Sequence, residues 1–285
     1  MKVIKRGGWA LFAVFVCCQS LYAASDRLSL NGPLVQGGLV TGRVVPGSRV
    51  TLDGKEITVT KEGIFLLGFD RDAQPLATLE ITYPDGLSDR RQLRVERRNF
   101  HIQRIDGLPP RKVTPSAEDL QRIRRENALI RKARARRDMR TDFLAGFIWP
   151  ARGRISGVYG SQRILNGKPR RPHFGVDVAG AVGDPVVAPA PGIVTLVHRD
   201  MFFSGGTLLI DHGLGLTSAF LHLSRIVVKE GERVRQGQKI AEIGATGRVT
   251  GPHLDWRMNL GDIRVDPQLL AGPMPESEAR AALQD

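Results

Sequence analysis

His173-Phe174-Gly175-Val176-Asp177 is the stretch of sequence from which the interpretation of this chain starts. Side chains two and four residues apart lie on one face of a β-strand, so His173 and Asp177 can point the same way with only Gly175 between them. A glycine there leaves room for an ion or a substrate. His253-Leu254-Asp255 repeats the arrangement, because His253 and Asp255 also share a face. Imidazole and carboxylate groups are ligands that zinc accepts.

The whole-chain composition indicates a globular and strongly basic protein. The chain has 285 residues, enough for one large or two ordinary domains, with a hydrophobic content of 41%. The formal net charge is +13, which favours anionic partners or surfaces. Nucleic acid is such a partner, but the sequence contains no recognition motif for it, so we expect none. A basic surface that only keeps the protein soluble is an equal alternative.

The N-terminus has the pattern of a targeting segment. Lys2, Lys5 and Arg6 precede an apolar run from Trp9 to Cys18, and Ala23-Ala24 follows near a cleavage point. We therefore predict a signal peptide over residues 1–24 and a periplasmic or cell-envelope protein, with an uncleaved anchor as the alternative. Both cysteines of the chain lie in this segment. The mature protein would contain no disulfide and, after cleavage, no membrane span.

Two further regions precede the histidine-rich part of the chain. Apolar residues alternate with polar ones from residue 26 to 106, with Asp53-Gly54 and Pro84-Asp85-Gly86 as turns, which predicts a small β-sandwich. Its role is either binding and positioning or simply spacing. Residues 107–145 read as a linker that contains a basic helix over 116–140. The charges surround this helix, which favours a solvated linker over an arm for anionic glycan or lipid.

The fold class we expect is therefore mainly β, with the chemistry concentrated at the C-terminal end. Short β-type runs separated by Gly and Pro predict an antiparallel domain over residues 147–271, followed by a tail over 272–285. Five of the six histidines lie in this domain. His212 beside Asp211 is typical of a structural hydrogen bond, and His198 and His101 of the surface. Leu254 and Trp256 point away from the proposed site and should lie in the core.

Ordered motifs in this domain resemble those of the lysostaphin-type zinc metallopeptidases, the M23 family of peptidoglycan endopeptidases. Gly160-Ser161-Gln162-Arg163 precedes the H-x-G-x-D stretch at 173–177, and Pro185 to Gly192 resembles the strand that follows it. Asp211-His212-Gly213 and Leu221-His222-Leu223-Ser224 stand at the H-G and H-L-S positions. Gly244-Ala245-Thr246-Gly247 and Thr250-Gly251-Pro252-His253-Leu254 match G-x-T-G and T-G-P-H-L. The resemblance covers about residues 149–270.

The resemblance implies a role for each matching residue. His173 and Asp177 fall on zinc ligands, and His222 and His253 on the two histidines that assist catalysis. The third ligand position is a second histidine in the family (H-L-H), but here it is Asp255, and Arg257 stands where the family is usually acidic. A carboxylate also satisfies zinc, so we expect Asp255 to be the third ligand, with Arg257 and Arg163 supporting the site or binding substrate.

The resemblance thus implies an exported zinc-dependent endopeptidase that cuts peptide cross-links of peptidoglycan, with other envelope proteins left open as partners. The chain contains no H-E-x-x-H helix with a Glu base, so a histidine must move the proton. One alternative is a degenerate member of the family, in which Asp255 pairs with Arg257 and the protein binds the wall or activates other hydrolases. A second, weaker alternative is a biotinyl- or lipoyl-type carrier, suggested by the turn Glu230 to Gln238 before Lys239.

Overall fold

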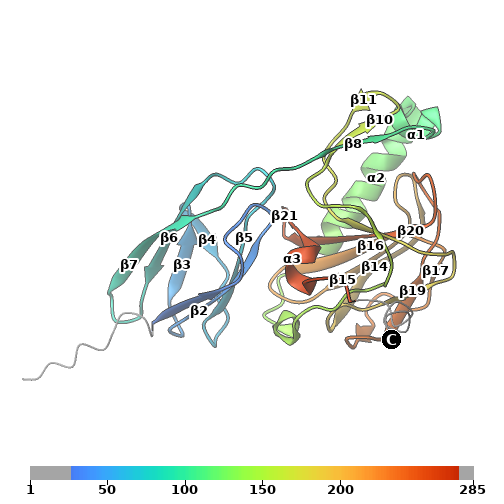
Figure 1. The fold of residues 1–285 in the computed structure, drawn as a ribbon. Coiled ribbons are helices and arrows are strands. Elements are labelled where there is room, and N and C mark those ends of the chain that lie inside the picture. Colours follow the sequence, from blue (N-terminus) through green and yellow to red (C-terminus); the bar gives the residue numbers. More distant parts are fainter. Residues whose placement is uncertain (1–26, 276–285) are drawn as a thin grey trace, which may run out of the picture.

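The computed structural model describes residues 27–275, and most of its regular secondary structure is β-strand, arranged in sheets that are almost entirely antiparallel (Figure 1). The predicted mainly β fold class is confirmed. The proposed signal peptide, residues 1–24, and residues 276–285 of the proposed tail lie outside the described residues. No helix within residues 27–275 is long and apolar enough to cross a membrane.

Two small antiparallel sheets form the N-terminal unit. One has the order β1-β2-β5 and the other β4-β3-β6-β7. Apolar residues of both sheets meet in one buried cluster, with Phe65 and Leu67 from the first and Val50, Leu79 and Ile81 from the second. The strands are β1 (Leu28–Asn31), β2 (Leu39–Val44), β3 (Arg49–Leu52), β4 (Lys55–Ile57), β5 (Ile64–Gly68), β6 (Leu76–Thr82) and β7 (Ser88–Arg94).

The chain then crosses to the C-terminal domain through β8 (Ile102–Ile105) (Figure 1). β8 pairs in parallel with β10 (Gln162–Leu165), which also pairs with β11 (Lys168–Pro169). Thus β8 lies outside the two N-terminal sheets, although the sequence placed it in the sandwich. The short helix α1 (Pro110–Val113) follows, and its Val113 packs with Leu108 and Leu165 in a small apolar cluster.

The basic helix α2 runs over Ala117–Arg134. Ser116 caps it, because its hydroxyl accepts from the Asp119 backbone N–H while the Asp119 carboxylate accepts from the Ser116 N–H. The helix ends at Arg134 rather than at the predicted Arg140. The expectation of a solvated linker helix is wrong, because Ala133 and Ile130 pack on an apolar patch of the large sheet. A 3₁₀ turn, η2 (Asp142–Ala145), leads into the sheet.

An eight-stranded antiparallel sheet carries the C-terminal domain. Its order is β18-β14-β15-β16-β20-β12-β9, with β21 paired to β20. A second sheet, β13-β19-β17, packs beside it, and α3 (Pro267–Ala271) ends the described chain. The strands are β9 (Ile155–Gly157), β12 (Val176–Ala179), β13 (Pro185–Val187), β14 (Gly192–Met201), β15 (Gly205–Asp211), β16 (Leu216–Leu223), β17 (Arg225–Ile226), β18 (Arg233–Val234), β19 (Lys239–Glu242), β20 (His253–Leu260) and β21 (Ile263–Val265).

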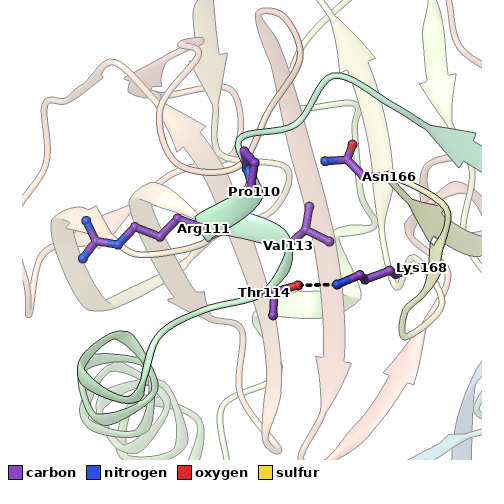
Figure 2. Close-up of a pocket in the computed structure, with 6 residues that line it drawn as sticks. All are labelled: Pro110, Arg111, Val113, Thr114, Asn166 and Lys168. Carbon is purple, nitrogen blue, oxygen red and sulfur yellow. Dashed lines mark hydrogen bonds between the residues drawn. The ribbon is translucent and has the colours of Figure 1, made fainter.

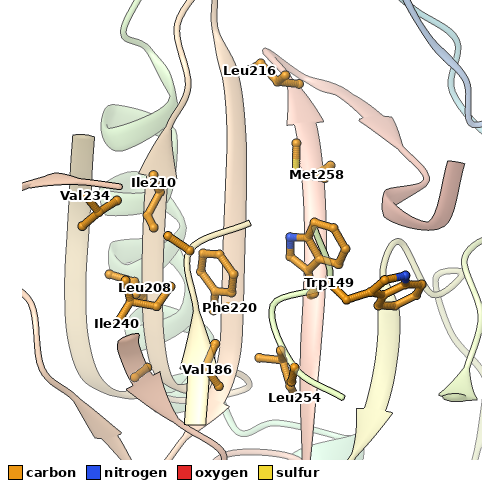
Figure 3. Packing of buried hydrophobic residues seen from close by; sticks show 14 of the residues in the cluster. Trp149, Val186, Leu208, Ile210, Leu216, Phe220, Val234, Ile240, Leu254 and Met258 are labelled. Atoms are coloured by element: carbon orange, nitrogen blue, oxygen red, sulfur yellow. The ribbon is translucent and has the colours of Figure 1, made fainter. Parts of the chain in front are cut away.

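The two faces of the large sheet have different roles, and strand β20 shows why. Leu254, Trp256 and Met258 are fully buried in the main apolar core on one face. Figure 3 shows Leu254 and Met258 in this core with Trp149 and Phe220, and the ring of Trp149 lies 5.8 Å from that of Trp256. The expectation that Leu254 and Trp256 lie in the core is confirmed. Asp255 and Arg257 alternate with them and therefore belong to the opposite face. That face also carries the patch beneath α2, because Ala219 pairs with Arg257 and Leu221 with Asp255.

Candidate metal centre

Strand pairing brings two carboxylates together on the face of the sheet opposite the main core. Asp177 on β12 lies directly across from Asp255 on β20, and across from Gly157 on β9. A Cβ atom at Gly157 would lie 2.2 Å from Asp177 Oδ2, so only glycine fits beside this carboxylate. A Cβ at Gly175 would lie 2.6 Å from both Asp255 Oδ1 and Arg257 Cγ. The space that Gly175 leaves is therefore filled by these two side chains, rather than left open for an ion or substrate.

His173, Asp177 and Asp255 form a compact group of potential metal ligands. One ligand atom from each lies within 4.8 Å of the other two, and all three residues are buried. Tetrahedral zinc with bonds of about 2.1 Å would place its ligand atoms about 3.4 Å apart. The separations of at most 4.8 Å, with His173 Nε2 and Asp177 Oδ1 at 3.0 Å, are therefore close to those that a bound ion requires.

His173 and Asp177 carry buried polar atoms without hydrogen-bond partners in the described part of the chain, which makes the space between them suitable for a cation. Nε2 of His173 and Oδ1 of Asp177 lie 3.0 Å apart without hydrogen-bond geometry. Within the described residues, both ring nitrogens of His173 and this Asp177 oxygen are buried and lack a hydrogen-bond partner. Buried polar atoms without partners are costly, and a divalent cation bound to both groups would remove the cost. The donor set, one imidazole and two carboxylates, fits zinc.

Each carboxylate of this group also has its own arginine. Arg163 Nη2 donates to Asp177 Oδ2 at 2.5 Å. Arg257 donates twice to Asp255, from Nε to Oδ1 at 2.9 Å and from Nη2 to Oδ2 at 2.6 Å. Burial opposes ionisation of both acids, but neighbouring positive charge prevails: the pKa of Asp255 falls far below its usual range, chiefly through Arg257, and the pKa of Asp177 is lowered through His173 and Arg163. Both acids are therefore ionised at neutral pH.

His222 and His253 face these carboxylates in one consistent orientation. Nδ1 of His222 lies 2.8 Å from the carbonyl oxygen of Thr246, and Nδ1 of His253 lies 2.9 Å from that of Gly251. A carbonyl only accepts, so each Nδ1 carries the proton and each Nε2 is left with a lone pair. Nε2 of His222 is 4.0 Å from Asp255 Oδ2, and Nε2 of His253 is 3.9 Å from Asp177 Oδ1. Two basic nitrogens thus border the group.

The backbone at His222 is unusual, which marks this position further. His222 has a φ of 66°, a left-handed conformation that costs a non-glycine residue about 1–3 kcal/mol. Hydrogen bonds to Ser204 O from the backbone and to Thr246 O from the ring hold it there. Burial, the largest effect, lowers the pKa of His222 to about 4. The ring is therefore neutral at physiological pH.

The other histidines lie away from this group. His212 is fully buried, with Nδ1 2.7 Å from Pro191 O and Nε2 2.7 Å from Ser218 Oγ, so the expected structural hydrogen bond is confirmed. His101 is exposed, and His198 Nδ1 accepts from the Asp200 backbone N–H. Lys239, the residue of the carrier hypothesis, begins β19 and pairs with Glu242 at 2.8 Å.

Comparisons with known proteins agree with this geometry. The pattern of Peptidase family M23 matches residues 171–267, which include the three potential ligands and the two histidines that border them. A solved structure described as a putative peptidase M23 from Pseudomonas aeruginosa is 34% identical, with a TM-score of 0.65 over 85% of this chain and 96% of that one. This chain therefore belongs to peptidase family M23, as the motifs predicted.

Curated relatives match a little over a third of this chain. Peptidoglycan DD-endopeptidase ShyB of Vibrio cholerae serotype O1 is 40% identical over 106 residues, which are 37% of this chain and 25% of ShyB. A Pseudomonas aeruginosa protein named lipoprotein NlpD/LppB homolog is 36% identical over 104 residues, 36% of this chain and 33% of that protein. The match thus spans a quarter to a third of these relatives, so it compares domains and not whole proteins.

Proposed function

We propose that this protein is an exported zinc-dependent metalloendopeptidase that hydrolyses peptide cross-links of peptidoglycan. The observation that carries the proposal is the convergence of His173, Asp177 and Asp255, with two unpartnered buried ligand atoms between the first two. Membership of family M23 and the name of ShyB, a peptidoglycan DD-endopeptidase, support the substrate class. Export follows from the pattern of residues 1–24 and accords with a substrate outside the cytoplasm.

His173, Asp177 and Asp255 would hold the zinc ion. Asp255 can contribute an oxygen while it accepts from Arg257, because each carboxylate oxygen has two lone pairs. When bound, zinc supplies a Lewis acid and lowers the pKa of a water molecule towards about 7. Arg163 and Arg257 would keep the two carboxylates ionised and oriented, which is the usual role of partners outside the ligand set.

The two assisting histidines would do the proton work. With Nδ1 fixed to a backbone carbonyl, Nε2 of His222 or His253 can accept a proton from the attacking water and return it to the leaving amine. The other ring, once protonated, can donate a hydrogen bond to the oxyanion that develops on the carbonyl. The ring centroids lie 4.9 Å apart, so both nitrogens reach one reacting peptide.

Digestion of purified peptidoglycan tests this function directly. The chain, purified from the exported fraction, should contain about one zinc per molecule by elemental analysis and release cross-link fragments that mass spectrometry detects. A chelator should stop the release, and added zinc should restore it. Asp177→Asn, which keeps the size of the side chain, should lose both zinc and activity. A protein that binds zinc yet leaves every cross-link intact would contradict the proposal.

A degenerate wall-binding or activator protein is the second candidate, and one contact favours it. Both oxygens of Asp255 already accept from Arg257, as in a closed ion pair that needs no metal. If this candidate is correct, the purified chain contains no zinc at micromolar supply, yet still sediments with peptidoglycan. Stimulation of a separate wall hydrolase by the metal-free chain would then identify an activator.

A further inference from the structure

An arginine that forms no salt bridge with any described residue lies on the loop that orients both assisting histidines. This loop joins β19 to β20, and the carbonyls of its residues Thr246 and Gly251 hold the rings of His222 and His253. Arg248 lies between these two residues. Its backbone N–H donates to Phe203 O, and its guanidinium stacks on the Phe203 ring at 4.5 Å. The position of Arg248 beside the catalytic histidines is therefore fixed by the fold.

The half-buried guanidinium of Arg248 has few partners within the described residues. Among residues 27–275 no carboxylate lies within 4.0 Å of it, whereas Arg163 and Arg257 each have one. Its side-chain hydrogen bond is a long one, 3.4 Å, to the carbonyl oxygen of Lys112. Burial and repulsion by Arg163 and Arg257 lower the pKa of Arg248 to about 10. An anion beside the guanidinium of Arg248 would offset both its loss of solvation and its repulsion by the other arginines.

A second arginine donates to the neighbouring carbonyl of the same backbone. Arg170, in the segment that precedes His173, donates from Nη2 to the carbonyl of Val113 at 2.8 Å. The carbonyls of Lys112 and Val113, consecutive in α1, thus accept from Arg248 and Arg170 respectively. Figure 2 shows α1 against the neighbouring Asn166 and Lys168, with the hydrogen bond from Lys168 to Thr114. Two consecutive backbone carbonyls of α1 therefore accept from two arginines that lie near the site, since Arg170, Arg163 and Asp255 all influence the pKa of Arg248.

We propose that Arg248, together with Arg170, binds a free carboxylate of the peptide substrate beside the scissile amide, in the place that the Lys112 and Val113 carbonyls occupy in this structure. The inference rests on the proposed peptidase function and adds a substrate feature to it. A carboxylate accepts two hydrogen bonds from a guanidinium and carries the charge that a carbonyl lacks, so it displaces α1 favourably.

Two matched peptides test this subsite by calorimetry on the full zinc-supplied chain. Both contain a cross-link whose amide is replaced by a non-hydrolysable methylene-amine, and they differ only in whether the neighbouring carboxyl is free or a carboxamide. The wild type should bind the free carboxyl about 10–100-fold more tightly, as expected for a hydrogen-bonded charge. Arg248→Gln should abolish the preference, while Arg235→Gln, an exposed arginine after β18, should keep it. Equal affinity for the two peptides, or no binding of either, overturns the subsite.

A variant of α1 tests the shared place. Val113→Ala loosens α1 from Leu108 and Leu165, so the free-carboxyl peptide should bind more tightly while the preference over the carboxamide remains. Unchanged or weaker binding would mean that α1 and the carboxylate do not compete, which overturns the location.

Hydrolysable versions of the same peptides separate this inference from the proposed function. Binding with the stated preference but no cleavage would leave the subsite standing and contradict the peptidase. Cleavage of both peptides at equal rates and with equal affinities would support the peptidase and contradict the subsite.

Discussion

Two buried imidazoles of the C-terminal domain show opposite hydrogen bonding. His212 is fully buried, and both of its ring nitrogens have a partner, Pro191 O and Ser218 Oγ. His173 is just as buried, yet neither of its ring nitrogens has a hydrogen-bond partner within the described residues. Because the two rings are equally buried in the same domain, loose packing does not explain the lack of hydrogen-bond partners at His173 within the described residues. The difference supports our proposal that His173 binds a metal ion, whereas the hydrogen bonds of His212 are structural.

The surroundings of the two rings differ in the same way. Around His212 lie a carbonyl, a hydroxyl and the ring of Phe147 at 5.3 Å, a neutral environment. Around His173 lie Asp177 and Asp255, each ionised by an arginine, with two further imidazoles at their edge. Charged groups therefore surround His173, whereas neutral groups contact His212. Substitutions and changes of pH can alter the surroundings of His173 and of His212 separately, and the largest effect is expected for the assisting histidines.

Removal of either assisting histidine should separate catalysis from metal binding. His222→Ala and His253→Ala should each lower the rate of cross-link cleavage by about 10²–10⁴-fold, because a proton-transfer group is lost. Zinc content by elemental analysis should stay at the wild-type value, and circular dichroism should show the same fold. A variant that releases zinc would show that the replaced histidine is a zinc ligand, as we propose for His173, and not an assisting group.

Asp255 should control zinc affinity. Asp255→Ala should weaken binding by more than about 100-fold, beyond the range of groups that act only through a ligand, because three ligands become two. Asp255→His should restore it, since imidazole suits zinc. Competition with a chromogenic chelator measures the affinity, and Asp255→Asn is the matched control for size. Unchanged zinc affinity in Asp255→Ala would mean that Asp255 pairs with Arg257 and does not bind zinc.

Acid should destabilise the protein through His212. Burial lowers its pKa to about 4, against about 6.5 in an unfolded chain, so between these values only the unfolded chain binds the proton. The free energy of unfolding should therefore fall as the pH falls through this window, by about 3 kcal/mol for this group. Urea unfolding at pH 7, 6 and 5 measures the slope. His212→Asn, whose amide can still donate to Pro191 O, should lose about one proton's worth of that slope; an unaltered slope would refute the assignment.

Arg257 should have the smallest effect. Arg257→Ala should weaken zinc binding by about 10–100-fold, because Asp255 loses the donors that orient it. The zinc affinity of Arg257→Lys should lie between those of the wild type and Arg257→Ala, since lysine keeps the charge without the two-point contact. Tighter zinc binding in Arg257→Ala would mean that the ion pair competes with the metal. The degenerate candidate would then account better for the wild-type chain.

The sequence by itself determined the class of fold and the family. The order of the motifs from Gly160 to Leu254 identified family M23, because these short elements keep their chemistry and order without reference to any contact. Local pattern also separated Leu254 and Trp256, which lie in the core, from Asp255, since strand alternation depends only on sequence spacing. The same local reasoning placed the start of the basic helix at Ser116.

Tertiary structure alone decided how these residues are used. Arg163 and Asp177 are 14 positions apart, Asp177 meets Asp255 only through the pairing of β12 with β20, and the contact of Arg248 with Lys112 spans 136 positions. Spacing along the chain carries no information on such contacts. The helix α2 was misjudged for the same reason: its charges predicted a solvated surface, but Ala133 and Ile130 found an apolar patch on the sheet. The sequence thus named the candidate site residues, whereas long-range packing fixed their partners, because burial and charge pairing depend on neighbours that only the folded chain brings together.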